Sequence, residues 1–147
     1  MKRDLRFEAV YPNRLEEVWH ALTDSRSLAD WLMENDFRPL PGHKFHFRSK
    51  SRFGMERLIP CEVLVVDEPR LLSWSWGDEG SVVTFRLKAI TGGTRLILEH
   101  TGLKGVCGLA LAWVLSHGWA RKIDWRLPAM LARAASEQTP YEHRLRH

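Results

Sequence analysis

His100 is the side chain of this 147-residue sequence whose type and setting best suit chemistry. It follows Leu96 and Leu98 at alternate positions of a strand-like segment, so its ring should point toward an apolar face. A buried imidazole can orient a ligand through a hydrogen bond or, when burial tunes its pKa, act as a general base. A hydrogen-bonded core histidine is the more common outcome. Glu99 points to the opposite face and cannot assist directly.

The other histidines and the arginines are weaker candidates. His117 could border a pocket, although a surface or edge position suits it better, and His46 should face solvent. Arg48 and Arg52 could bind an anionic group at the rim of a cavity, whereas solvated strand-end charges are the simpler interpretation. No two histidines share a metal-ligand spacing with a carboxylate, so we predict no metal site.

Sequence motifs of the common enzyme classes are missing. The serines stand outside a G-x-S-x-G context, and no glycine-rich loop that could hold phosphate joins a strand to a helix. The pair Gly92-Gly93 is explained by a hairpin turn. We therefore predict no catalytic residue and no cofactor, and the sequence favours a non-enzyme without deciding the question.

Tryptophan is abundant, with seven residues, and its placement indicates where an apolar site could lie. If each strand points its apolar side inward, several rings share one sheet face and oppose further rings from a late helix. Such an arrangement is either a closely packed core or the wall of a partly open pocket, and composition cannot separate the two. The candidate pocket residues are Trp31, Phe45, Phe47, Trp74, Trp76, Phe85, Trp113 and Trp119, with His100 as polar anchor.

The strands that must position these residues are indicated by alternation of apolar and polar side chains. A first strand is predicted at about 5–10, and five more between 45 and 100, separated by turn-forming residues. Every neighbouring pair of the later strands can be joined by a short hairpin, so the sheet should be antiparallel.

Helices are predicted on either side of these later strands. Asn13, with Glu16 three residues later, should cap a short helix, and Asp24 or Ser25 should cap a second. Apolar residues three or four apart predict a long helix over about 106–135. Pro128, and Gly118 before it, should weaken or kink this helix. It must cover the apolar face of the sheet, because no other segment is long enough.

Composition limits the remaining possibilities. The formal charge of +4 is scattered, without the basic helix and surface aromatics of a nucleic-acid binder. Cys61 and Cys107 lie in apolar surroundings, which suits two buried free thiols in a reducing cytoplasm. A disulfide between them is the alternative. The apolar run at 106–115 is too short to span a bilayer, so we predict no membrane insertion. We expect a cytoplasmic single domain, monomeric or weakly dimeric, with its core at about 5–135 and a polar tail at 136–147.

The order of several short motifs is similar to that of a known family. They are Pro12 with VWHALT at 18–23, LADW at 28–31, PGHKFHF at 41–47, VLVVDEP at 63–69, LLSW at 71–74, GTRLILEHTGL at 93–103, and GW at 118–119. Together they resemble the activator of Hsp90 ATPase homologue family, within the START / Bet v 1-like (SRPBCC) superfamily, over about residues 5–131. Pro41 in place of a usual glycine, and Pro128 in the final helix, depart from the family pattern.

The resemblance implies an α+β helix-grip fold. This is a curved antiparallel sheet of about six strands around one long C-terminal helix, with two short helices after the first strand and a cavity between sheet and helix. It implies no single function, because relatives include ligand carriers, polyketide cyclases, stress-response proteins and a chaperone co-factor.

Three functional hypotheses follow from the residues and the resemblance. The leading one is non-covalent binding of a small apolar or aromatic molecule, and aromatic walls suit ring-shaped ligands better than straight acyl chains. The second is a stress-related protein-interaction module with a chaperone or other protein partner. The third is a cyclase-like enzyme that uses His100 as acid or base.

Overall fold

A computed structural model describes residues 2–50, 54, 56–78, 80–104 and 117–135. Several expectations lie outside these residues. They are the candidate pocket residue Trp113, the rim candidate Arg52, the thiol of Cys107, the first part of the predicted long helix and the polar tail at 136–147.

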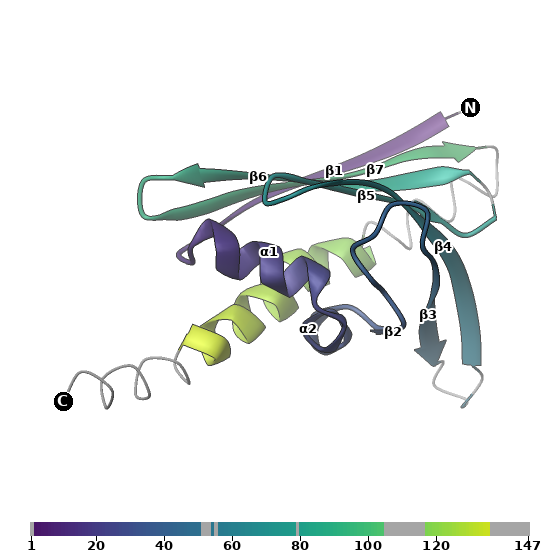
Figure 1. Ribbon diagram of the computed structural model, residues 1–147, viewed down its shortest axis with the longest axis horizontal. Coiled ribbons are helices and arrows are strands. Elements are labelled where there is room, and N and C mark those ends of the chain that lie inside the picture. Colours follow the sequence, from purple (N-terminus) through teal and green to yellow (C-terminus); the bar gives the residue numbers. More distant parts are fainter. Residues whose placement is uncertain (1, 51–53, 55, 79, 105–116, 136–147) are drawn as a thin grey trace.

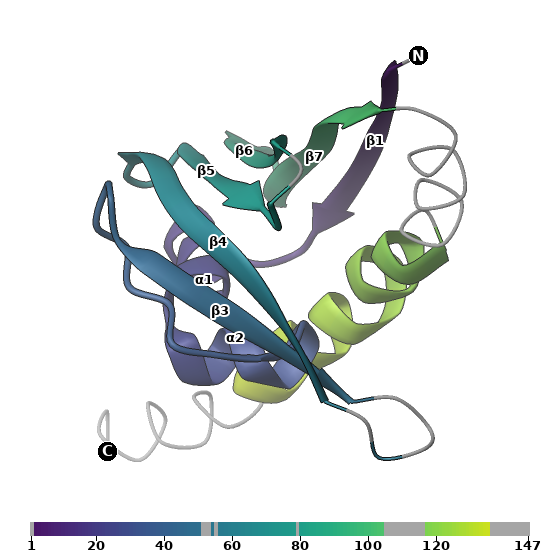
Figure 2. The same ribbon diagram turned by 90° about the vertical axis from the view of Figure 1, so that its right-hand side faces the viewer.

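The core of the fold is one antiparallel sheet of seven strands in the order β1-β7-β6-β5-β4-β3-β2 (Figure 1). The first strand therefore pairs with the last, and the strands between follow as consecutive neighbours. The sheet curves, so that β3 and β4 lie across the helices when it is viewed from the end (Figure 2). The strands are β1 (Lys2–Tyr11), β2 (Glu34–Asn35), β3 (Lys44–Lys50), β4 (Glu56–Asp67), β5 (Leu71–Trp76), β6 (Ser81–Ile90) and β7 (Gly93–Lys104).

Alternation along the strands produces the buried face, as the sequence predicts. Phe85 in β6 stands in register with Leu72 of β5 and Leu98 of β7, and all three side chains have no exposed surface. The hairpin between β6 and β7 requires both of its glycines. Gly92 has φ +83°, and a Cβ at Gly93 would collide with the carbonyl oxygen of Tyr11.

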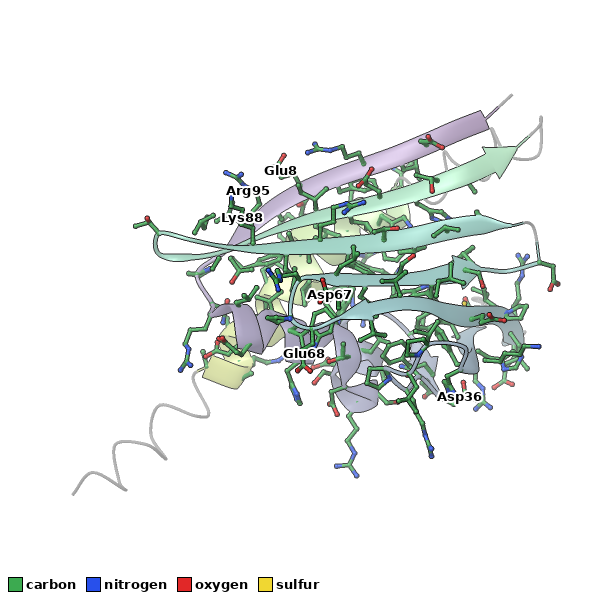
Figure 3. The ribbon with its side chains drawn as sticks, turned by 45° about the horizontal axis from the view of Figure 1, so that its top comes forward. Glu8, Asp36, Asp67, Glu68, Lys88 and Arg95 are labelled. Atoms are coloured by element: carbon green, nitrogen blue, oxygen red, sulfur yellow. The ribbon has the colours of Figure 1, made fainter. Side chains whose placement is uncertain are left out.

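The opposite face of the sheet carries charges. Arg95 lies 3.2 Å from Glu8 on the neighbouring strand, and Figure 3 shows both side chains on the outer surface together with Lys88. Arg86 and Glu99 form a second cross-strand pair at 3.1 Å. Exposed pairs of this kind contribute well under about 1 kcal/mol each, so they define the solvent face more than they stabilise the sheet.

Two short helices follow β1, α1 (Leu15–Thr23) and α2 (Ser25–Trp31), and both lie beneath the sheet (Figure 1). Asp24 caps α2 as predicted, because its carboxylate accepts a 3.0 Å hydrogen bond from the backbone N–H of Ser27. The predicted cap of α1 is wrong. Arg14 occupies that position without a side-chain bond, and the amide of Asn13 donates instead to Glu17.

A helix at 117–135 packs under the inner face of the sheet (Figure 1). It contains a π-helical turn, η1 (Lys122–Arg126), just before Pro128. The N–H of Leu127 bonds to the carbonyl of Lys122 in place of Ile123, and Pro128 has no N–H to offer. The freed carbonyl of Ile123 accepts a 2.7 Å hydrogen bond from the buried Tyr11 hydroxyl. The irregularity predicted at Pro128 is therefore a π-turn, and Tyr11 of β1 provides the hydrogen bond that the Ile123 carbonyl lacks within the helix.

The sheet contains one strand that the sequence analysis did not predict. β2 has only two residues, and it pairs with β3 through Glu34 opposite Arg48 and Asn35 opposite Phe47. Such a short strand carries no alternation that a sequence pattern could reveal. Its position beside α2 joins the two short helices to the edge of the sheet.

Candidate ligand-binding site

The predicted inward rings come together as one ring cluster. Trp31, Phe45, Phe47, Trp74 and Phe85 have no exposed surface. Trp74 is at the centre, with ring centroids 5.1 Å from Phe85, 5.7 Å from Phe47 and 5.9 Å from Phe45. Tilted and edge-on contacts at these distances are the favoured geometries for aromatic pairs. These five rings contact one another closely and fill the space beneath the middle of the sheet.

Phe37 also belongs to the ring cluster, which the sequence analysis missed. Its centroid lies 5.1 Å from Phe45 and 5.9 Å from Trp74, and it is 3% exposed. The residue stands in a stretch rich in proline and glycine, which predicts a loop and hides an inward side chain. The available signal was an aromatic residue at the start of such a loop.

The two buried indoles of the cluster differ in hydrogen bonding. The N–H of Trp31 donates to the carbonyl oxygen of Ala21 at 2.8 Å, which ties α2 to α1. The N–H of Trp74 has no acceptor among the described residues. Because both side chains are fully buried, replacing each indole should change the free energy of unfolding by a different amount.

Trp76 and Trp119 occupy a different position from the ring cluster. Their centroids are 5.7 Å apart, and together they line a hollow of about 230 Å³ between the end of β5 and the C-terminal helix. We call this hollow the aromatic pocket. The sheet contributes Ser49 from β3 and Ile59 from β4, the segment after α2 contributes Leu32 and Met33, and the C-terminal helix at 117–135 contributes Gly118 and Lys122. The pocket is therefore bounded by both the sheet and the helix, at the side where Figure 2 shows β3 and β4 crossing the helix layer.

His100 is buried, as predicted, and both of its ring nitrogens have protein partners. The indole N–H of Trp119 donates to Nδ1 at 3.1 Å, and Nε2 lies 3.1 Å from the hydroxyl oxygen of Ser81. An indole nitrogen can only donate, so Nδ1 accepts and Nε2 carries the proton. The Ser81 hydroxyl in turn donates a hydrogen bond of 3.1 Å to the carbonyl oxygen of Trp76. This chain joins Trp119 to Trp76 through the histidine.

The surroundings keep His100 neutral. Burial lowers its pKa from 6.5 to about 4. No carboxylate of the described residues contributes to this shift, so within this part of the chain His100 has no charged neighbour that would make it a strong base near neutral pH. A ligand could bond to His100 only by displacing Trp119 or Ser81. The geometry therefore suits a residue that fixes the two tryptophans of the aromatic pocket.

The remaining sequence candidates lie away from the aromatic pocket. His46 is exposed, as predicted, and Nε2 of His43 lies 3.0 Å from the carbonyl oxygen of Asp36. Arg48 is 3.8 Å from Glu34 at the outer edge of the sheet. His117 is exposed at the first described position of the helix. No group of three metal-ligating side chains occurs among the residues described.

Lys122 is a pocket residue that the sequence analysis did not select. It lies three residues after Trp119 and four after Gly118, so all three share one side of the helix. That spacing was the signal in the sequence. The signal is weak, because a lysine beside an apolar helix stripe usually faces solvent.

A second hollow lies on the far side of the C-terminal helix. Trp125 is 75% exposed there and borders a groove of about 700 Å³, together with Asp30, Arg121, Asp124, Arg126 and Arg133. Arg133 pairs with Asp30 at 3.0 Å, and Arg126 donates to the Asp30 carbonyl oxygen. We call this surface the Trp125 groove.

In the part of the chain that the structure covers, no helix is long and apolar enough to cross a membrane.

The seven-stranded curved sheet closed on a late helix is the helix-grip architecture of Bet v 1-like proteins, as predicted. The chain belongs to the family described as activator of Hsp90 ATPase homolog 1-like protein, whose model matches residues 13–132. The family resemblance inferred from the sequence is thereby confirmed. No curated protein matches the chain.

Solved structures with the same fold come from several bacteria. Protein MLL2253 from Mesorhizobium loti is 30% identical, with TM-score 0.77 over 89% of this chain and 98% of that one. Protein BH1534 from Bacillus halodurans is 32% identical, with TM-score 0.74 over 88% and 96% of the two chains. Protein SA2116 from Staphylococcus aureus has a higher TM-score of 0.82 over 92% and 97%, at 15% identity, which shows the fold alone.

Proposed function

We propose that the protein binds a small ring-containing molecule non-covalently in the aromatic pocket. The observation that carries this proposal is the pocket itself, bounded by Trp76 on the sheet and Trp119 on the helix. Its volume of about 230 Å³ is below the usual range for drug-sized ligands, which favours a ligand of one or two rings.

Burial of apolar ligand surface supplies the affinity. Each Å² removed from water contributes about 25 cal/mol, less the cost of ordering the ligand. His100 contributes indirectly, because it holds the indole of Trp119 by a hydrogen bond of 3.1 Å. The ring cluster supports the pocket from behind. Its members Trp31, Phe45, Phe47, Trp74 and Phe85 would reach a ligand only if the cluster opened.

The test is titration with the neutral fluorescent probe N-phenyl-1-naphthylamine, whose emission rises in apolar surroundings. Ile59 lines the aromatic pocket, so Ile59→Trp should fill it and abolish saturable binding. Leu58 is the preceding residue of β4 and is 55% exposed, so Leu58→Trp adds the same indole outside the pocket and should leave binding intact. Equal binding by the two variants would place the probe elsewhere and reject the proposal.

A second candidate function is a protein-interaction module with a chaperone partner. The family name supports it, and so does Trp125, because an indole that is 75% exposed is a common anchor of protein interfaces. The test is the ATPase rate of a purified bacterial Hsp90 with and without the protein. This hypothesis expects stimulation that Trp125→Ala removes and Ile59→Trp leaves unchanged. Stimulation that survives Trp125→Ala, or none at all, argues against this surface.

We also propose that the protein acts in the cytoplasm. The support is Cys61, a free thiol that is 3% exposed. Free buried thiols are usual in reducing compartments. Fractionation of cells that express the tagged full chain would test this location.

A further inference from the structure

Lys122 brings a positive charge to the aromatic pocket. Every other described side chain of the pocket wall is uncharged, and most are apolar. Lys122 itself is half-buried, and no hydrogen bond or ion pair joins its ammonium group to another described residue. Desolvation of a charge without a partner costs free energy, which an anionic ligand would recover.

Among the described residues, no carboxylate compensates the charge of Lys122. Burial lowers its pKa, and the cationic side chains of Arg126 and Arg121 lower it further. Neighbouring arginines behave differently. Arg133 pairs with Asp30 at 3.0 Å and Arg126 donates to the carbonyl oxygen of Asp30, both on the outer side of the helix. Lys122 is thus a cation on the pocket side of the helix, and no described residue pairs with its ammonium group.

Gly118 keeps this ammonium group uncovered. A Cβ at Gly118 would lie 4.0 Å from Nζ of Lys122, so any longer side chain there would pack over the charge. Glycine costs about 1 kcal/mol relative to alanine inside a helix. The helix therefore carries a weak helix former at the position where a side chain would cover Lys122.

We propose that the aromatic pocket takes an apolar acid, with its ring system between Trp76 and Trp119 and its carboxylate on Nζ of Lys122. The inference rests on the proposed function, because it assigns a charge to the ligand of the same pocket. A carboxylate accepts charge-assisted hydrogen bonds from an ammonium group, and these are stronger than neutral ones. Partial burial strengthens the attraction further, since water screens it less.

The test compares two competitors that differ in charge and scarcely in shape, 2-naphthoate and 2-naphthamide. Each is titrated against protein that already holds the neutral probe N-phenyl-1-naphthylamine. We expect naphthoate to displace the probe from the native protein at a roughly five- to tenfold lower concentration than naphthamide. In Lys122→Met the two competitors should become equal, with naphthamide unchanged. Lys122→Gln is a second neutral variant in case the methionine disturbs folding.

Arg121→Met is the matched control. Arg121 is the preceding residue of the same helix, is exposed, and borders the Trp125 groove instead of the aromatic pocket. The control removes one positive charge from the same region and should keep the preference for naphthoate. Equal displacement by both competitors in the native protein, or loss of the preference in Arg121→Met, would overturn the carboxylate assignment and leave the proposed function standing. A probe that does not bind would overturn both.

Discussion

The hydroxyl of Tyr11 donates a hydrogen bond of 2.7 Å to the carbonyl oxygen of Ile123, across 112 positions of the chain. Pro128 explains why that carbonyl needs a partner, because the π-turn before it leaves Ile123 without a helical N–H. Burial raises the pKa of Tyr11 well above its usual value, so the phenol keeps its hydrogen at all physiological pH values. A side chain of the first strand thus completes the hydrogen bonding of the last helix.

Tyr11→Phe should lower the free energy of unfolding by about 1–2 kcal/mol, because it leaves a buried carbonyl without a partner. Urea denaturation followed by circular dichroism measures this loss. The matched test is the same change in a Pro128→Ala background. There residue 128 regains an N–H, the turn can return to α-helical bonding, and Ile123 no longer depends on Tyr11. Equal losses in both backgrounds would show that the two positions are not coupled.

His100 should make the stability of the protein depend on pH. The folded state has a pKa of about 4 and the unfolded state about 6.5, so the unfolded chain binds more protons between these values. The contribution of the neutral ring is complete above pH 6.5 and is lost as the pH falls to about 4. Each pKa unit corresponds to about 1.4 kcal/mol, so the total approaches roughly 3 kcal/mol.

The variant His100→Gln isolates this effect. Glutamine can accept from Trp119 and donate to Ser81 as His100 does, but it does not titrate. The difference in unfolding free energy between native and variant proteins should therefore shrink as the pH falls from 7 toward 4. His46→Gln, which makes the same change at an exposed histidine, is the control. Parallel curves for His100→Gln would contradict the buried neutral ring.

Trp31 and Trp74 form a natural comparison within the ring cluster. Both are fully buried, so replacement by phenylalanine removes the same volume at each. Trp31→Phe also removes the hydrogen bond of 2.8 Å to Ala21, whereas Trp74→Phe removes an N–H that has no described acceptor. We expect Trp31→Phe to cost more by about 1–3 kcal/mol in chemical denaturation. A larger loss for Trp74→Phe would indicate an acceptor for its indole.

Cys61 should resist thiol reagents in the folded protein. Burial raises its pKa to about 12 and leaves it 3% exposed, so little thiolate forms and little reagent reaches it. In a Cys107→Ser background, alkylation at pH 8 should be at least about a thousandfold slower than for a free cysteine and should accelerate with urea. Rapid alkylation without denaturant would contradict the buried position.

Much of this fold is predictable because strand alternation is a local property. Phe45, Trp74 and Phe85 belong to separate strands, yet each is placed on the inner face by its own neighbours. The inward direction of His100 follows in the same way. Its partners do not, since Ser81 and Trp119 reach it only through the packing of β6 and the C-terminal helix.

The pocket is less predictable than the fold. Alternation assigns Trp74 and Trp76 to the same face, but only the assembled sheet shows that Trp74 is enclosed by rings while Trp76 borders a hollow. Lys122 was missed because a charged residue beside an apolar helix stripe usually faces solvent. The curvature that brings β3 and β4 around to this side of the helix is a property of the whole sheet.

The attachment of the C-terminal helix and the shape of the pocket depend on different strands. Tyr11 in β1 and His100 in β7 hold the helix by buried hydrogen bonds, whereas Ser49 in β3 and Ile59 in β4 shape the opposite side of the pocket. Substitutions at the second pair leave the first pair untouched. The shape of the pocket can therefore change while the helix stays anchored to the sheet.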